Sequence, residues 1–277
     1  MQLQEWLNKN RKFFNESDLR FLIKNELNNT ALLFSDGVHL SSHKLGHLES
    51  VKEMYIKGMP LAYILGKEDF LGWEFKVNKE VLVPRRETEL ITEKAIDIIK
   101  KENLRYVLDL CCGCGNIAIS IKKSSKDTLV FASDISPKAL RVAKANAEFH
   151  NTGINLISTD LFKGFKYGKF DIIISNPPYV EEENIKGALE HEPRIALWGG
   201  ADGLYFIKKI IGEAYFYLKE SGYLVLEIGS NHKEPLERYI DTIKSYEIIE
   251  WIKDYSGNWR GTVLRPKIKN QRSKSKC

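Results

Sequence analysis

The sequence predicts an α/β domain with a mostly parallel β-sheet covered by helices on both faces, preceded by a small helical domain. From about residue 85 onward, short aliphatic and β-branched runs alternate with segments of helical periodicity. This alternation is typical of parallel sheets whose strands are joined by helices. The first 66 residues show helical spacing alone. A chain of 277 residues with 43% hydrophobic and 29% charged residues is long enough for two globular parts.

The amino-terminal domain is expected over residues 1–66. Apolar residues recur at helical spacing in 16–27 and again in 48–56, and Gly58-Met59-Pro60 is expected to end the helical part. His39, His43 and His47 recur at every fourth residue, a spacing that suits metal ligands on one helix face. No carboxylate joins them at motif spacing, so we interpret them as a solvated or partly packed face.

A β-hairpin is expected to connect the two domains over residues 67–84. From Phe70 to Pro84, aromatic and β-branched residues alternate with others, and Gly72-Trp73 and Asn78-Lys79 supply turns. A helix then opens near Pro84. The α/β domain, expected over 85–266, has strands predicted at 106–110, 130–134, 154–157, 170–175 and 223–228, with a helix at 136–149 between the second and third.

Composition and charge narrow the class of protein. No apolar run approaches the roughly 18 residues that span a bilayer, and Met1 to Trp6 lack the features of a secretory signal. We therefore expect a cytoplasmic protein without membrane contact. The net charge of +5 comes largely from a tail, 267–277, with five basic residues and no acidic one. This tail is expected to be disordered, and direct nucleic-acid binding is not expected.

A glycine turn after the first strand of the α/β domain indicates a nucleotide-like cofactor. The segment runs Asp109-Leu110-Cys111-Cys112-Gly113-Cys114-Gly115-Asn116, and Asp134 follows Gly115 by nineteen residues at the end of the second strand. Such a turn lets the backbone approach a ligand, and an acidic residue at the second strand suits ribose hydroxyls. Cys111 departs from the G-x-G-x-x-G pattern of dinucleotide sites, whereas the spacing of Asp109, Gly113 and Gly115 is the usual form for S-adenosylmethionine. The alternative is a plain tight turn.

Cys111 and Cys114 also form a Cys-x-x-Cys pair. A redox pair would need a stabilised thiolate, and a zinc site needs four ligands, for which the sequence offers no second pair. We interpret the cysteines as small residues that fill a close turn, and expect no metal. Their clustering excludes an ordinary disulfide framework and fits a reducing compartment.

The strand at 170–175 delivers Asn176-Pro177-Pro178-Tyr179 at its carboxyl end, where ligands bind in open α/β sheets. An amide or exocyclic amine is a poor nucleophile because its lone pair is delocalised. The Asn176 side-chain oxygen and the Pro177 carbonyl can each accept one N–H of a substrate NH₂ and orient the nitrogen toward a methyl-sulfonium. The prolines stiffen the loop, and Tyr179 gives a flat wall for a planar group. These four residues are thus the candidate catalytic and substrate-binding residues of a nitrogen methyltransferase.

With these motifs, the chain resembles the release factor glutamine methyltransferases (the HemK type), which have a Rossmann-like class I methyltransferase domain. The resemblance covers about 60–265. It includes Pro60 to Gly66, Val81 to Glu89, Glu192 to Leu197 and Gly199 to Leu204, which flank the catalytic motif. Amino-directed DNA methyltransferases share Asn-Pro-Pro-Tyr but lack this surrounding set.

The resemblance implies N5-methylation of the glutamine in the Gly-Gly-Gln motif of peptide-chain release factors, with S-adenosylhomocysteine as product. It implies that the helical domain holds the release factor, and we expect a monomer. It further implies that Cys111 to Gly115 line the methionine part of the cofactor, that Asp134 holds the ribose, and that Asp160 and Leu161 lie along the adenine. Asn176 would touch both cofactor and substrate.

Two departures from the family pattern stand out. Cys111 and Cys114 replace residues that are usually glycine and a small polar residue, and a Cβ at position 111 is expected to tighten or tilt the loop and lower cofactor affinity. Arg86 stands where the family usually has a proline that stiffens the start of the helix. Neither removes a group that the chemistry uses.

Three other functions remain open at this point. A ribosomal-protein glutamine methyltransferase would carry the same catalytic motif. An adenine-N6 methyltransferase would need a basic target-recognition region, and the first 66 residues show no such concentration of charge. A non-catalytic binding protein would be expected to lack Asn176 or Asp134, yet both are present.

Overall fold

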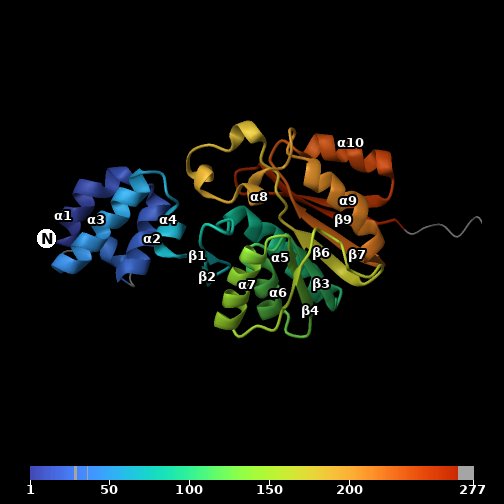
Figure 1. The fold of residues 1–277 in the computed structure, drawn as a ribbon, viewed down its shortest axis with the longest axis horizontal. Helices are drawn as coiled ribbons and strands as arrows, with labels where there is room; N and C mark the ends of the chain where they lie inside the picture. Colours follow the sequence, from blue (N-terminus) through green and yellow to red (C-terminus); the bar gives the residue numbers. More distant parts are fainter. Residues whose placement is uncertain (28–29, 36, 268–277) are drawn as a thin grey trace, which may run out of the picture. The chain divides into compact units, whose positions relative to one another are not determined.

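The structure is a computed structural model that describes residues 1–27, 30–35 and 37–267 (Figure 1). The tail expected over 267–277 therefore lies, except for Lys267, outside the described residues. The chain forms two compact units: Met1–Lys67 with Gly187–His191, and Glu68–Lys186 with the chain from Glu192 onward. In the described part of the chain, no helix is long and apolar enough to cross a membrane.

The first unit is helical. Its helices are α1 (Leu3–Asn10), α2 (Glu16–Leu27), α3 (Ser42–Ile56) and α4 (Leu61–Leu65), with the 3-10 turns η1 (Arg11–Phe13), η2 (Thr30–Phe34) and η4 (Gly187–His191). Their apolar faces enclose a core that includes Leu3, Trp6, Leu22 and Leu48. Pro60 does not end the helical part as expected. It is the N-cap of α4, a helix start where the missing N–H costs nothing.

The three histidines do not share one helix face, because α3 begins at Ser42 and His39 lies before it in a bridge to Gln2. The His47 ring nitrogen lies 3.1 Å from Glu26 Oε1, and that of His39 lies 2.7 Å from Gln2 Nε2. No cluster of three metal-ligating side chains occurs among the described residues. The interpretation of the three residues as one face is thus wrong for His39, which precedes α3.

The hairpin is shorter than predicted. Its strands are β1 (Lys67–Phe70) and β2 (Trp73–Lys76), and Leu71 and Gly72 take φ values of 48° and 75° in the turn between them. The chain beyond Lys76 runs to α5 without strand structure, so the expected extension to Pro84 is wrong. Asn146 holds β2 in place by accepting from Lys76 N (2.8 Å) and donating to Lys76 O (3.0 Å).

The second unit contains one seven-stranded sheet, in the order β5-β4-β3-β6-β7-β9-β8 (Figure 1). The parallel strands are β3 (Tyr106–Leu110), β4 (Leu129–Asp134), β5 (Asn155–Ser158), β6 (Phe170–Ser175) and β7 (Leu218–Glu227). β8 (Tyr246–Lys253) and β9 (Trp259–Pro266) add an antiparallel edge. The predicted α/β class with a mostly parallel sheet is confirmed.

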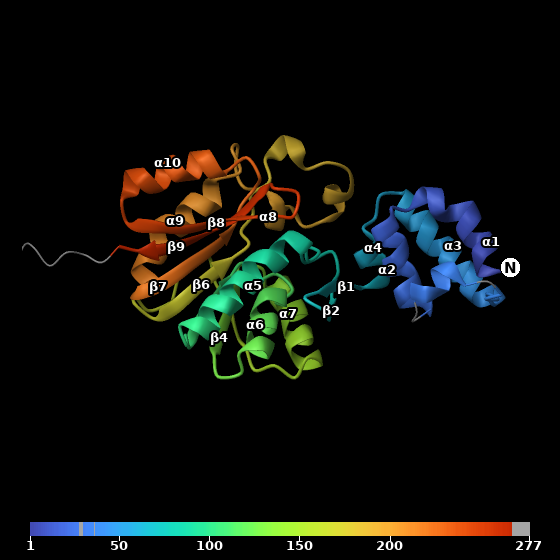
Figure 2. The ribbon, with the colours of Figure 1, turned by 180° about the vertical axis from the view of Figure 1, so that it is seen from behind.

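Helices cover both faces of this sheet, as Figure 2 shows from behind. Helices α5 (Arg86–Lys101), α6 (Asn116–Ser124) and α7 (Pro137–Phe149) pack on one face, and α9 (Tyr205–Tyr217) and α10 (Lys233–Ile243) pack on the other. Alternate strand residues serve the two cores: Val107 contacts the first group, and Leu108 contacts the second. Short turns, η3 (Glu182–Asn184) and α8 (Arg194–Leu197), follow the catalytic motif. Arg86 begins α5 without a proline.

Candidate active site

The sheet order brings the predicted site residues to one edge. β3, β4 and β6 are neighbours and run parallel, so their carboxyl ends meet. Cys111 follows β3, Asp134 ends β4, and Asn176 follows β6. From β3 the chain adds β4 and β5 on one side, and then β6 and β7 on the other side. The boundary between β3 and β6 is therefore the topological switch point, where open α/β sheets bind ligands.

The turn after β3 needs left-handed backbone at three positions. Cys111, Gly113 and Gly115 have φ values of 63°, 52° and 82°. A Cβ on Gly115 would lie 3.2 Å from the Ala143 Cβ, so glycine there lets the turn pack against α7. Cys111 pays a steric penalty that glycine avoids, about 1–2 kcal/mol for an L-residue in this region. This strain gives a physical reason why glycine would fit position 111 more easily than cysteine.

Asp134 braces the turn. Its carboxylate accepts from Gly113 N (2.9 Å) and from Ser136 N (2.8 Å). Burial raises the pKa of this carboxyl, and the two backbone N–H groups oppose the rise. Asp109 lies deeper, fully buried, and accepts from Ala118 N (3.0 Å). We therefore interpret Asp109 as a brace between β3 and α6, and Asp134 as the acidic group at the ligand cavity.

A cavity of about 150 Å³ opens at this edge of the sheet. Its lining is mostly apolar and comes from the linker after the hairpin, from the ends of β3 and β4, and from the loops near the catalytic motif. Six predicted site residues line it: Cys111, Gly113, Asp134, Asp160, Leu161 and Pro178. The other predicted residues do not: Asp109, Cys112, Cys114, Gly115, Asn176, Pro177 and Tyr179.

Several lining residues escaped the sequence analysis. They are Val81 and Leu82 before α5, Ile135 directly after Asp134, and Phe206 at the start of α9. Ile135 offered a signal by its place, because it directly follows the predicted ribose ligand Asp134, and the structure leaves it 52% exposed. Val81 and Leu82 belong to a segment that carried the family resemblance without an assigned role.

The three described thiols are not activated. Cys112 and Cys114 are buried, and Cys111 is half-buried. Burial raises the pKa of Cys111 and Cys112, and that of Cys114 to about 12, with the nearby carboxyls adding to the rise. A redox pair needs the opposite shift.

The amide of Asn176 is oriented by its surroundings. Its Nδ2 donates to Thr88 Oγ1 at 3.0 Å, and Thr88 is buried in the first turn of α5. Oδ1 of Asn176 has no hydrogen-bond partner among the described residues. An unpaired amide oxygen at the carboxyl end of β6 is the acceptor that the predicted chemistry requires.

Tyr179 is fixed at the other end of the motif. Its hydroxyl donates to Glu227 Oε1 at 2.8 Å, and its ring meets His232 edge-on with centroids 6.1 Å apart. A Cβ on Gly199 would lie 2.5 Å from the Tyr179 Cα. Gly199 and Gly203 therefore make room for the Tyr179 backbone, which explains the glycines of the segment after the motif.

Glu227 is the functional candidate that sequence reasoning missed. It is fully buried on β7, and burial raises its pKa from 4.5 to about 7, although the hydroxyls of Thr88 and Tyr179 act to lower it. Its Oε2 has no partner with hydrogen-bond geometry within the described chain. A carboxylate inside an otherwise apolar strand was the available signal.

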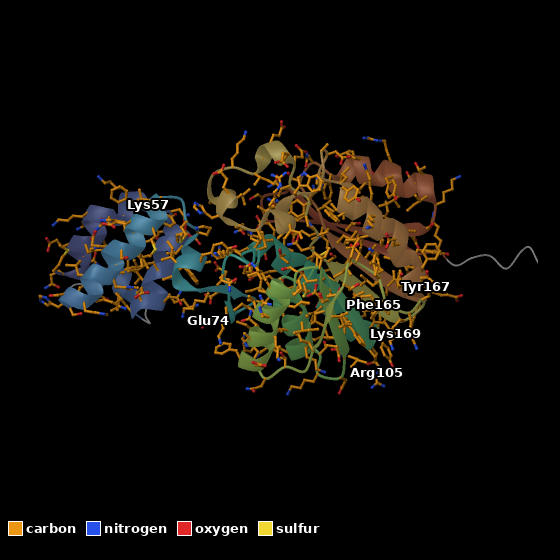
Figure 3. The ribbon with its side chains drawn as sticks, in the orientation of Figure 1. Lys57, Glu74, Arg105, Phe165, Tyr167 and Lys169 are labelled. Carbon is orange, nitrogen blue, oxygen red and sulfur yellow. The ribbon has the colours of Figure 1, made fainter. Side chains whose placement is uncertain are left out.

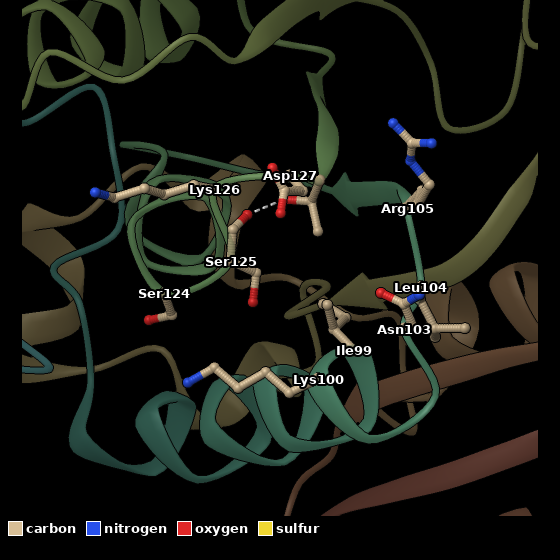
Figure 4. Close-up of a pocket in the computed structure, with 10 residues that line it drawn as sticks. Ile99, Lys100, Asn103, Leu104, Arg105, Ser124, Ser125, Lys126 and Asp127 are labelled. Atoms are coloured by element: carbon tan, nitrogen blue, oxygen red, sulfur yellow. Dashed lines mark hydrogen bonds between the residues drawn. The ribbon is translucent and has the colours of Figure 1, made fainter.

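The opposite edge of the sheet carries other features. A pocket of about 580 Å³ there is lined by the ends of α5 and α6 and by loop residues that precede β3 and β4, among them Arg105 and Asp127 (Figure 4). Figure 3 labels Arg105, Lys169 and the exposed Tyr167 in the same region. These residues precede the strands whose opposite ends hold the catalytic motif, so they lie away from the candidate active site.

Comparisons with known proteins agree with this geometry. The family model "Methyltransferase small domain" matches residues 88–193. The chain is 32% identical to the release factor glutamine methyltransferase of Fusobacterium nucleatum, over 96% of this chain and 81% of that protein. It is 35% identical to the Bacillus subtilis protein of the same name, over 89% of each. It is 42% identical to the protein of the same name from Borreliella burgdorferi, over 75% of this chain and 73% of that protein.

Solved structures share the fold. A ribosomal protein L11 methylase from Lactobacillus delbrueckii aligns with a TM-score of 0.51 at 21% identity, covering 68% of this chain and 82% of that one. A methyltransferase from Pyrococcus furiosus aligns with a TM-score of 0.51 at 20% identity, covering 81% and 98%. These likenesses support the methyltransferase fold of the second unit.

Proposed function

The chain belongs to the release factor glutamine methyltransferases, and from this premise we propose that it methylates the side-chain amide nitrogen (N5) of a glutamine in peptide-chain release factors. The glutamine is that of the Gly-Gly-Gln motif. The methyl donor is S-adenosylmethionine, and S-adenosylhomocysteine is the product. We further propose that the enzyme is a cytoplasmic monomer and that residues 1–66 bind the release factor.

The residues of the cavity fit the cofactor. Asp134 uses each carboxylate oxygen for one backbone N–H and keeps lone pairs for ribose hydroxyls. Leu161, Ile135 and Phe206 supply apolar surface for a base, and the left-handed turn at Gly113 exposes backbone to the ligand. Bound S-adenosylmethionine supplies an electrophilic methyl group on a sulfonium.

The catalytic motif activates the amide by orientation. Asn176 Oδ1 and the Pro177 carbonyl accept the two N–H groups of the glutamine side chain. This holds the nitrogen so that its lone pair points at the methyl group. Methylation of this nitrogen would release one of its protons to solvent water, and S-adenosylhomocysteine would leave as the second product. No strong base is required, because positioning and electrostatics supply the rate enhancement.

One observation carries the proposal: the Asn176 amide group gives its N–H to Thr88 and leaves Oδ1 open. The decisive experiment incubates the protein with labelled S-adenosylmethionine and a purified release factor, beside a release factor whose Gly-Gly-Gln glutamine is replaced. We expect label in the first only. Equal labelling of both, or label only in duplex DNA or in ribosomal protein supplied as alternative substrates, would overturn the assignment.

Asn176→Ala separates binding from chemistry. Because one of two amide acceptors disappears, most turnover is lost while the affinity for S-adenosylmethionine stays within about tenfold. Calorimetric titration measures the affinity, and single-turnover labelling measures the chemistry. Full turnover at saturating cofactor would contradict the role of Asn176.

A further inference from the structure

The catalytic motif is anchored at both ends by side chains from other elements. Asn176 donates to Thr88 of α5, and Tyr179 donates to Glu227 of β7. Burial of Thr88 and Glu227 places them behind the motif, away from solvent. The Thr88 hydroxyl also lies near enough to Glu227 to lower its pKa. Both anchors therefore act on the Glu227 carboxyl: Tyr179 through a hydrogen bond to Oε1 and Thr88 through its effect on the pKa, while Oε2 has no partner with hydrogen-bond geometry among the described residues.

The Tyr179 hydroxyl donates to Glu227, and the Thr88 hydroxyl acts to lower the pKa of the same carboxyl. An ionised carboxylate only accepts hydrogen bonds, so it accepts one from the Tyr179 hydroxyl and attracts the hydroxyl hydrogen of Thr88. Thr88 then offers lone pairs to Asn176, whose NH₂ must face Thr88 and whose oxygen must face the substrate. Reversal of this order would present the Asn176 NH₂ to the substrate amide, and two donors would oppose each other.

The charge of Glu227 is not used elsewhere. The charged or titratable groups that act on it are Tyr179, Glu87 of α5 and Arg260 of β9. Arg260 is committed to Asp254, with Nε 2.8 Å from Oδ2, and lies 3.6 Å from Glu87. Within the described chain, Glu227 has no ion pair, and an unpaired buried carboxylate costs free energy. Such a cost is typical of functional positions.

We propose that Glu227 is a positioning residue for methyl transfer. It touches no reacting atom. Through Thr88 it sets the direction of the Asn176 amide, and through Tyr179 it fixes the far end of the motif. This inference rests on the proposed function for its kinetic consequences, but the direction of the Asn176 amide can be measured without turnover.

The positioning role predicts a pH dependence with a defined sign. Protonated Glu227 carries an O–H that donates toward Thr88 and disturbs the order. The active enzyme is therefore the one with ionised Glu227. Because burial raises the pKa of Glu227 to about 7, kcat should rise as the pH rises through this value. The substrate glutamine does not contribute to this pH dependence, because its side-chain amide does not titrate near pH 7. His232, beside Tyr179, has its pKa lowered by burial and so moved away from this range.

The kinetic test compares Glu227→Gln with Glu220→Gln, an exposed glutamate on the same strand. Glu227→Gln is nearly isosteric, but its NH₂ donates toward Thr88. We expect kcat to fall by about 10- to 100-fold with KM for the release factor within about threefold, and the limb near pH 7 to vanish. Glu220→Gln keeps the wild-type profile. An unchanged limb in Glu227→Gln would overturn the proposal.

Thr88 variants test the route to Asn176. Thr88→Val removes the hydroxyl at constant shape and is expected to lower kcat as Glu227→Gln does. Thr88→Ser keeps the hydroxyl and is expected to retain activity within about threefold. Equal loss in both Thr88 variants, with wild-type melting temperatures, would show that packing rather than the hydroxyl matters and would overturn the inference.

A readout independent of activity completes the test. In protein labelled with ¹⁵N-asparagine, the side-chain NH₂ signals of Asn176, assigned from the spectrum of Asn176→Ala, should shift with a midpoint near pH 7 in the wild type and not in Glu227→Gln. Wild-type protein that labels no release factor but shows this titration would refute the proposed function alone. Activity without the titration would refute the positioning role alone.

Discussion

Removing the buried charge of Glu227 should stabilise the sheet domain at alkaline pH. The folded pKa of this carboxyl is about 7, above its ordinary value of 4.5, because the group is fully buried. Between these two pH values the folded chain keeps a proton that the unfolded chain has released. Stability is therefore at its full value below about pH 4.5 and is lost as pH rises through about 7.

The size of the loss follows from the two pKa values. Their difference corresponds to about 3 kcal/mol of unfolding free energy, lost between pH 4.5 and 8. Glu227→Gln has no titrating group at this position. Its free energy of unfolding should therefore rise relative to wild type by about that amount across the same window. The hydrogen bond from Tyr179 can be kept, because the amide oxygen of glutamine still accepts.

Native-state hydrogen exchange at the β7 backbone amides is the suitable assay. It reports the unfolding free energy of the sheet itself, even where the helical unit unfolds separately. Measurements from pH 5 to 8, corrected for intrinsic exchange rates, give the difference between wild type and variant. Glu220→Gln, on the same strand and exposed, controls for the loss of a surface charge. Parallel curves for wild type and Glu227→Gln would refute the reasoning.

Three further changes address the cofactor turn. Gly115→Ala places a Cβ 3.2 Å from that of Ala143, on a residue with φ 82°. Urea denaturation should show that the free energy of unfolding falls by about 1–2 kcal/mol. Unchanged stability would contradict the contact. Asp134→Asn removes a charged acceptor, so affinity for S-adenosylmethionine measured by calorimetry should fall about tenfold or more, and an affinity within twofold would argue against ribose binding. Because burial raises the pKa of the Cys112 and Cys114 thiols, iodoacetamide at pH 8 should label them only after unfolding; rapid labelling of the native protein would show that a thiolate is accessible.

Two of the strands that sequence analysis found, β3 and β6, are buried on both faces along most of their length, whereas β5 is not. Val107 to Leu110 and Ile172 to Ser175 are fully buried, so they appear as mostly apolar runs, in which Asp109 and Ser175 are the polar members. β8 was missed because it is the edge strand, where exposed charged residues such as Glu247 and Lys253 interrupt the apolar pattern. β9 lies between β7 and β8 and is buried at its centre, but Arg260 and Gly261 shorten its apolar run. The length of the hairpin was also misjudged, because alternation continues beyond Lys76 although no partner strand is present there.

Sequence analysis found the site residues that lie close together in the sequence and missed the partners that lie far away in it. The turn from Asp109 to Gly115 is one continuous stretch of sequence, and the catalytic motif is another, so the spacing within each could be recognised in the sequence. The partners that orient the motif are distant: Thr88 precedes Asn176 by 88 residues, and Glu227 follows Tyr179 by 48. Pairings across such separations depend on strand order. One sequence does not display strand order at the level of individual side chains.

The flanking segments that carried the family resemblance contact the candidate active site. Leu82 lines the cofactor cavity, and Thr88 orients Asn176. Glu192 of the second segment accepts from Val83 N at 3.0 Å and pairs with Arg85, so the two segments hold each other.

Gly199 and Gly203 then admit the Tyr179 backbone. A motif of four residues supplies acceptors for any planar NH₂ group, but the segments around it set where those acceptors lie and what lies beside them. Discrimination between a glutamine and a nucleobase should therefore follow these segments, because Asn-Pro-Pro-Tyr is common to enzymes of both kinds.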